Sequence, residues 1–152
     1  MSSFFETMNQ LVHDPRILQM KNFSQHNSST TFEHSVHVAL TSYRLAKCFR
    51  LKINEDSLAK GAMLHDFYLY NARGGEIGAW KHGKSHADTA LINSLKHFEL
   101  TELEKGIIYC HMWPLNITRV PRSKESFLIS LADKYCATKE LMARKRRVVP
   151  AA

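Results

Sequence analysis

Apolar residues recur every three or four positions along most of this chain, which is the spacing of an amphipathic helix. Alternation with a period of two is never sustained for more than a few residues, so few or no strands are expected. Helices are predicted over residues 2–22 with a break at Pro15, 30–49, 54–66 with a possible extension to Tyr70, 84–98, 101–112 and 124–144. The pattern therefore predicts an all-α fold, a compact single-domain bundle of about 6–8 helices.

Several helix boundaries are marked by start and stop signals. Thr30 and Thr101 each precede a glutamate by three residues, which is a capping box, and Asn54 is a favoured N-cap residue. Two prolines predict a loop at 114–122. Residues 71–83 hold four of the six glycines and predict a second loop. Loops of about a dozen residues are uncommon in compact domains and are often functional.

Length and composition limit the class of protein. The chain has 152 residues, and we predict one domain over residues 1–144 followed by a flexible basic tail at 145–152. There is no apolar run of ~20 residues and no signal-peptide pattern, which predicts a cytoplasmic protein that does not associate with membranes. Three scattered cysteines, Cys48, Cys110 and Cys136, are expected to be buried free thiols. The net charge of +7 favours acidic partners such as phosphorylated small molecules or nucleic acid.

Six ionisable residues stand out, most of them on apolar stripes of the predicted helices. They are His34, His65, Asp66, His86, His111 and Asp133. His34, for example, shares a stripe with Val38 and Leu45, and Asp133 lies with Ile129. A single histidine on an apolar face is more often a hydrogen-bonded core residue. Two ionised aspartates in an apolar setting need partners, however, and four histidines with a pair of divalent cations would supply them.

The order H…HD…H…H…D on an all-α scaffold resembles the HD-domain superfamily of metal-dependent phosphohydrolases, over residues 30–137. The resemblance is carried by Glu33-His34-Ser35, Gly61-Ala62-Met63-Leu64-His65-Asp66, His82-Gly83 before His86, His111 followed closely by Pro114, and Leu131-Ala132-Asp133-Lys134. A bare His-Asp dipeptide is weak evidence, whereas the ordered set of six is specific. The two histidines at positions 86 and 111 are typical of the binuclear members.

The resemblance implies two divalent metal ions. One would be held by His34, His65, Asp66 and Asp133, and Asp66 would bridge to a second held by His86 and His111. Mixed imidazole and carboxylate ligands suit iron or manganese first, with magnesium, cobalt, nickel or zinc as further possibilities. A hydroxide shared by the two ions would attack phosphorus. The implied activity is hydrolysis of a phosphomonoester or phosphodiester, with a nucleotide or another small phosphorylated compound as the substrate.

Basic side chains close to these positions are candidates for catalysis and substrate binding. The predicted catalytic residues are Asp66, Lys134 and His82, and the predicted substrate contacts are Lys81, His82, Lys84 and Arg44. For each basic residue a solvated or structural role is the competing interpretation. Glu33 or nearby serines are expected to accept a hydrogen bond from a ligand histidine, since such histidines need an acceptor on their second nitrogen.

Two other functions stay open. A mixed-valent di-iron oxygenase of the same fold would use the same ligands to activate oxygen, and a non-catalytic metal- or nucleotide-binding module would keep the site without turnover. The segment Phe67-Tyr68-Leu69-Tyr70 departs from the small residues common after this motif in signalling-nucleotide phosphodiesterases, which leaves the substrate open. The basic run Arg144-Lys145-Arg146-Arg147 could touch nucleic acid, although a solvated tail is the simpler interpretation.

Overall fold

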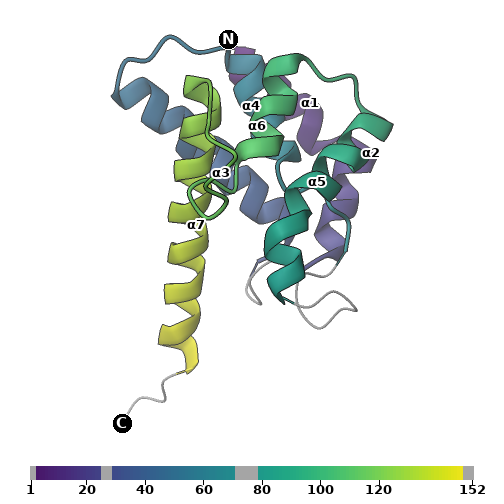
Figure 1. Cartoon of the computed structure of the whole chain (residues 1–152), viewed down its shortest axis with the longest axis vertical. Helices are drawn as coiled ribbons and strands as arrows, with labels where there is room; N and C mark the ends of the chain where they lie inside the picture. Colours follow the sequence, from purple (N-terminus) through teal and green to yellow (C-terminus); the bar gives the residue numbers. More distant parts are fainter. Residues whose placement is uncertain (1–2, 25–28, 71–78, 149–152) are drawn as a thin grey trace.

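The computed structural model describes residues 3–24, 29–70 and 79–148, with the description of 79–84 and 144–148 limited to the backbone. The helices of these residues are α1 (Ser3–Val12), α2 (Pro15–Leu18), the 3-10 helix η1 (Gln19–Asn22), α3 (Thr31–Cys48), α4 (Glu55–Leu64), α5 (Ala79–His97), α6 (Glu102–Cys110) and α7 (Lys124–Val148) (Figure 1). Within the described ranges, β-pairing is limited to one isolated bridge between Ser24 and Thr30. The predicted all-α fold class is confirmed. In the described part of the chain, no helix combines the length and hydropathy needed to cross a bilayer.

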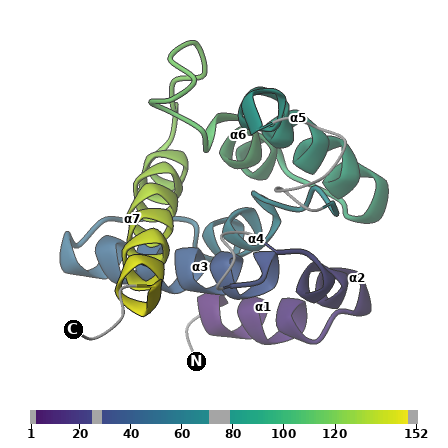
Figure 2. The same ribbon diagram turned by 90° about the horizontal axis from the view of Figure 1, so that it is seen from below.

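Helix α4 lies in the middle of the arrangement. It packs against α1, α3, α6 and α7, and Figure 2 shows α7 on one side of it with α5 and α6 on the other. Seven of its ten residues are buried, so it has almost no solvated face. The dipeptide that follows it therefore emerges among the surrounding helices rather than at the surface.

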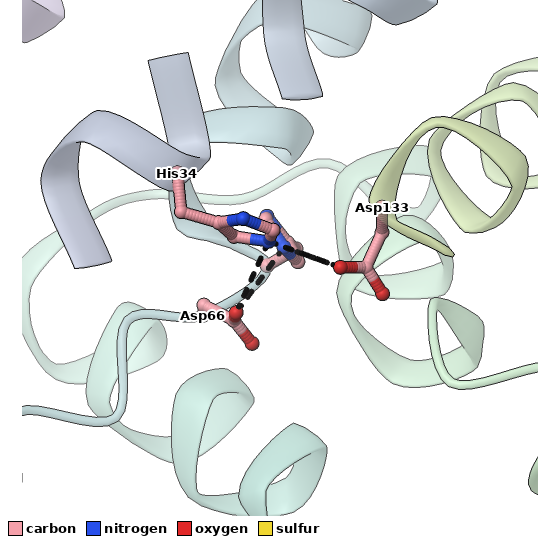
Figure 3. Close-up of side chains that lie close together, drawn as sticks. His34, Asp66 and Asp133 are labelled. Carbon is pink, nitrogen blue, oxygen red and sulfur yellow. Dashed lines mark hydrogen bonds and ion pairs between the residues drawn. The ribbon is translucent and has the colours of Figure 1, made fainter. Parts of the chain in front are cut away.

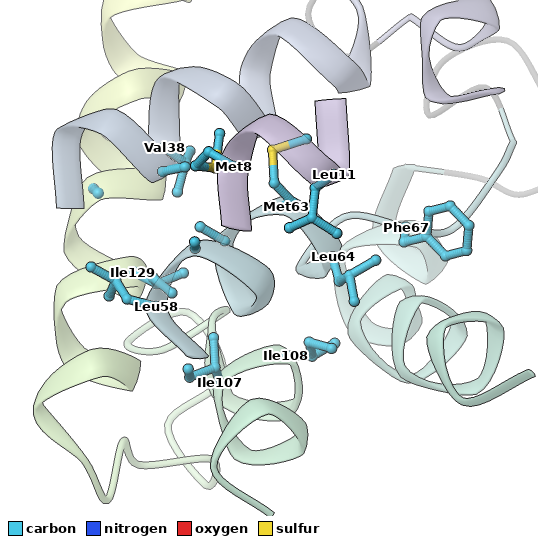
Figure 4. Close-up of a cluster of buried hydrophobic side chains, with 14 of the residues drawn as sticks. Met8, Leu11, Val38, Leu58, Met63, Leu64, Phe67, Ile107, Ile108 and Ile129 are labelled. Carbon is cyan, nitrogen blue, oxygen red and sulfur yellow. The ribbon is translucent and has the colours of Figure 1, made fainter. Parts of the chain in front are cut away.

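The hydrophobic core joins α4 to its neighbours (Figure 4). Its fully buried members include Leu58, Met63 and Leu64 of α4, Val38 of α3, Ile107 and Ile108 of α6, and Ile129 of α7. Burial of one such side chain stabilises the fold by roughly 1.5–3 kcal/mol relative to leaving it exposed. The same packing fixes the relative positions of helices that carry the candidate metal ligands.

The three predicted helix starts are confirmed. Thr30 and Thr101 each form a complete capping box with Glu33 and Glu104, and the Asn54 side chain accepts from the backbone N–H of Ser57. Each cap satisfies donors that the first turn of a helix leaves unpaired. The caps therefore help to set the residue at which α3, α4 and α6 begin.

Helix α4 ends earlier than the sequence pattern indicates. Its last residue is Leu64, and His65 and Asp66 form a turn in which the Phe67 N–H donates to the carbonyl of Leu64. Leu69 then has a φ of 55°, a left-handed conformation that a helix cannot include. The predicted extension to Tyr70 is therefore wrong.

Three other expectations need correction. Helix α5 begins at Ala79, inside the segment predicted as loop, because only one of the four glycines, Gly83, follows that residue and a single glycine costs a helix about 1 kcal/mol. Helix α7 continues past residue 144 to Val148, since the basic residues there are good helix formers and suit the negative end of the helix dipole. Cys48 is exposed rather than buried, whereas Cys110 and Cys136 are buried as expected.

Gly61 allows α6 to approach α4 closely. A Cβ at this position would lie 2.6 Å from Cγ2 and 2.8 Å from Cδ1 of Ile107. We expect Gly61→Ala to lower the free energy of unfolding by about 1–3 kcal/mol, as overpacking of a core does. The matched control is Gly106→Ala in α6, where nothing lies within 4 Å of the added Cβ. That variant should be neutral or more stable, and urea unfolding of both proteins measures the contrast.

Candidate metal centre

Four buried side chains from three parts of the chain converge beside the end of α4. The turn after α4 supplies His65 and Asp66, α3 supplies His34 and α7 supplies Asp133. Nε2 of His34 lies 3.0 Å from Oδ1 of Asp133 and 3.8 Å from Oδ2 of Asp66 (Figure 3). Nε2 of His65 lies 3.4 Å from Oδ2 of Asp66 and 3.8 Å from Oδ1 of Asp133. One ligand atom from each residue lies within 4.8 Å of all the others, so the four could hold a metal ion.

A second group, of three candidate metal ligands, shares Asp66 with the first group. Nε2 of His86, on α5, and Nε2 of His111, which caps the end of α6, each lie 3.5 Å from Oδ1 of Asp66. The two imidazole nitrogens are 3.0 Å apart. All three residues are buried, and they too could hold a metal ion.

The two oxygens of Asp66 therefore face different groups. Oδ2 faces His34 and His65, while Oδ1 faces His86 and His111. A carboxylate in this position can serve two cations at once. The termination of α4 at Leu64 matters here, because it releases Asp66 from the helix into a turn between α3, α5, α6 and α7.

Backbone and carboxylate acceptors orient the imidazole rings. Nδ1 of His65 donates to the carbonyl of Ala62, and Nδ1 of His111 donates to the carbonyl of Ile108, both at 2.7 Å. In the neutral ring this places the proton on Nδ1 and the lone pair on Nε2, facing the cluster. Metal-binding histidines in proteins are oriented in the same way by an acceptor on the second nitrogen.

The donor set fits divalent cations. Neutral imidazoles present lone pairs at Nε2 toward carboxylate oxygens that also carry lone pairs, an arrangement that needs positive charge between them. Nε2 of His65 is buried, and in the described part of the chain it finds no hydrogen-bond partner of acceptable geometry. Either protons or metal ions can supply the missing charge. The mixture of imidazole and carboxylate suits first-row divalent metals.

Without metal, the carboxylates favour protonation of His34 and His65. Burial opposes the charged form of His34, but hydrogen bonds to Asp133 and Glu140 outweigh it and raise its pKa to about 9. Burial also opposes the charged form of His65, but the nearby carboxylates of Asp66 and Asp133 outweigh it and raise its pKa to about 10. Burial lowers the pKa of His111 to about 4. The facing histidines hold the pKa of the Asp66 and Asp133 carboxyls well below the usual range, against the opposing effect of burial.

These shifts predict opposite effects of pH on metal-free and metal-loaded protein. Because the pKa values of His34 and His65 are raised in the folded state, their contribution to stability is complete below pH 6.5 and is lost as the pH rises to about 9–10. Bound metal displaces these protons, so its contribution grows over the same interval. We expect the difference in Tm between manganese-loaded and chelated protein to increase from pH 6.5 to pH 9. A difference that stays constant would show that metal does not compete with these protons.

Glu140 completes the site, although it is not among the residues predicted from the sequence. Its carboxylate oxygens accept from Nδ1 of His34 at 3.1 and 3.3 Å, and one of them also accepts from Oγ of Ser29. Glu33, the residue expected in this role, instead caps α3 by accepting from the N–H of Thr30. The signal was present in the spacing, because Glu140 follows Asp133 by seven residues and thus lies on the same face of α7, two turns further on.

We expect Glu140→Gln to weaken metal affinity by about 10–100-fold, because loss of an outer carboxylate lowers the basicity and order of the imidazole ligand. Competition with a chromophoric chelator measures the change. The control is Glu33→Gln, which alters only the cap of α3 and should leave metal affinity unchanged. Equal affinities in the wild-type protein and Glu140→Gln would contradict the role assigned to this carboxylate.

Of the remaining candidate residues whose side chains the structure describes, Lys134 lies at the cluster and Arg44 does not. Lys134 lies beside the cluster, where its Nζ donates to Oδ2 of Asp133 at 2.6 Å and to the carbonyl of His111 at 2.9 Å. Arg44 is exposed on α3 and lines a groove with Tyr135 and Glu140; it follows His34 by ten residues, about 15 Å along a helix, and is not brought to the cluster. The side chains of Lys81, His82 and Lys84 lie outside the described residues.

A comparison with protein families identifies the family of this chain. The family model described as HD domain matches residues 31–138, which is well over half of the chain. No curated protein sequence and no solved structure matches the chain significantly. The matched range begins with α3, ends within α7 and includes all six clustered histidines and aspartates. This chain is therefore a member of the HD-domain family.

Proposed function

We propose that this protein is a metal-dependent phosphohydrolase that uses two divalent ions to hydrolyse a small phosphate ester. The observation that carries the proposal is the position of Asp66, whose two oxygens face two separate groups of candidate ligands. HD-domain proteins are generally metal-dependent phosphohydrolases. Paired metal ions suit displacement at phosphorus because they stabilise both the attacking and the leaving oxygen.

The side chains have distinct roles in this proposal. Two bound ions would supply Lewis acidity and lower the pKa of a coordinated water. The hydrogen bonds from Nδ1 of His65 and His111 to backbone carbonyls hold the ligand nitrogens in place. The Lys134 ammonium orients Asp133, and because the Lys134 side chain is 26% exposed it can reach a phosphate that lies over the cluster. The roles of Lys81, His82 and Lys84 as further phosphate contacts remain proposals.

The proposed substrate is a nucleotide or another small phosphorylated compound. A net charge of +7 favours encounter with anionic molecules. The cluster residues are nearly inaccessible, with His86 and Asp133 the most exposed among them at 6% and 7%. A small terminal phosphate approaches such a site more easily than a duplex or a folded polymer does. We also propose a cytoplasmic location, because Cys48, Cys110 and Cys136 are free thiols, as is usual in a reducing compartment.

The test is turnover after metal removal and reloading. Phosphate release is measured under anaerobic conditions with manganese- or iron-loaded protein and a panel of 4-nitrophenyl phosphate, bis(4-nitrophenyl) phosphate and nucleoside monophosphates. Metal-dependent release from at least one class of ester is the expected result. Oxygen consumption by the iron form without phosphate release would indicate the di-iron oxygenase instead. Stoichiometric metal with no turnover on the panel would indicate a binding module.

A further inference from the structure

A cavity of about 640 Å³ lies beside α6, and none of its lining residues belongs to the metal cluster. It is lined by the outer face of α6, by the segment that precedes α7 and by the first turn of α7, including Gly106, Tyr109, Cys110, Arg119, Arg122 and Ser123. Helix α6 contributes its other face, with Ile107 and Ile108, to the core. The volume is within the ~300–1,000 Å³ range of small-molecule sites in proteins. Nothing in the proposed hydrolysis uses this cavity.

Gly106 is the first indication that the cavity is kept open for a ligand. A glycine inside a helix destabilises it relative to alanine, so such a residue calls for a reason. At Gly61 the reason is a close helix contact, whereas a Cβ at Gly106 would meet no atom within 4 Å. Packing therefore does not require this glycine. Any larger side chain here would project into the cavity that Gly106 lines.

Two arginines give the cavity its charge. Arg119 is held in place, with Nη2 donating to Oδ2 of Asp88 at 2.9 Å and Cζ lying 4.1 Å above the ring of Tyr109. Its Nη1 is buried and, among the described residues, has no hydrogen-bond acceptor. Arg122 is exposed at the rim. Glu102, the acidic lining residue, is itself paired with Lys105 at 2.6 Å.

The rest of the lining is suited to an apolar body. The ring of Tyr109 and the side chains of Leu103 and Val120 provide flat and aliphatic surface, with hydroxyl groups such as that of Ser123 beside them. We propose that this cavity binds a small organic anion, a carboxylate or phosphate carried on a flat apolar group. The apolar group lies over Gly106 and Tyr109, and the anionic group is bound by Arg122 with Arg119 behind it.

The test is calorimetric titration of the full metal-loaded protein with benzoate and with phenylphosphonate, which share a ring and differ in the anionic group. Gly106→Leu fills the cavity from its floor and should weaken binding at least about tenfold. Arg122→Gln removes an exposed charge and should weaken it by about 2–5-fold. The charge-matched control is Lys96→Gln on α5, an exposed position away from the cavity, which should change nothing. The headgroup that binds more tightly identifies the class of anion.

Binding of either probe that is lost in Gly106→Leu and retained in Lys96→Gln supports the proposal. Failure of both probes to bind at ~10 mM would overturn it, as would equal affinity in the wild-type protein and Gly106→Leu. Phenylphosphonate that binds only when metal is present, and binds equally in Gly106→Leu, belongs to the metal cluster and counts against the cavity. Thermal unfolding shows whether Gly106→Leu is folded, and Gly106→Ala provides a smaller obstruction with a better helix former.

Discussion

Asp66→Ala is expected to lose both metal ions and to reduce turnover by about 10³-fold or more, since removal of a single charge-stabilising group already costs ~10²–10³. The reason is the position of this one carboxylate. Oδ2 lies 3.4 Å from Nε2 of His65, and Oδ1 lies 3.5 Å from Nε2 of both His86 and His111. No other carboxylate in the described part of the chain belongs to both candidate groups. Metal analysis of the purified variant, with phosphate release, measures the result.

Two controls separate this effect from unfolding. Asp66→Asn keeps the size of the side chain and loses its charge, so it should fold and still fail to hold two ions. Asp56→Asn changes an exposed aspartate on α4, whose carboxylate accepts from Thr7, and should keep full metal content. A folded Asp66→Ala protein that carries two equivalents of metal would defeat the bridging role.

The site could be predicted from sequence where each residue lies on a helix face that periodicity defines. His34 and Asp133 are examples, because both follow core stripes that continue for several turns. Glu140 was missed because an acidic residue near the end of a long helix is usually solvated. Its carboxylate reaches His34 only because α7 packs along α3, a contact between segments more than 100 residues apart. The seven-residue spacing from Asp133 places Glu140 on the right face of α7, but it does not show which residue of another helix that face meets.

The helix boundaries also differ in how well they could be predicted from the sequence. Helix starts with a capping box, at Thr30 and Thr101, were predicted to the residue. The end of α4 was not, because Leu64 to Tyr70 continue an apolar pattern without glycine or proline to break it. The helix ends there because Asp66 lies against histidines of α5 and α6 and Leu69 adopts a left-handed backbone conformation, neither of which local propensity predicts. The departure from helix at this point is what makes Asp66 available to both groups.

Single substitutions in the second group should separate the two candidate metal positions. We expect His86→Ala and His111→Ala each to keep about one metal ion and to lose roughly 10²–10³-fold in turnover. Each change removes one of three ligands from the second group, while His34, His65, Asp66 and Asp133 stay intact. His86 is the cleaner test, because His111 is fully buried and its replacement leaves a void in the core, whereas His86 lies at the edge of the cluster with 6% of its surface exposed.

His97→Ala on α5 is the matched control for His86→Ala, since His97 lies eleven residues further along the same helix, about 16 Å away, and is exposed. It should keep two metal ions and normal turnover. If His86→Ala loses both ions, the two groups bind cooperatively through Asp66 rather than as separable sites. If it retains full activity with one ion, the first group alone performs the reaction, and His86 with His111 has a structural role. The expected combination, one ion retained and most turnover lost, requires the second group to hold a metal that acts in the reaction.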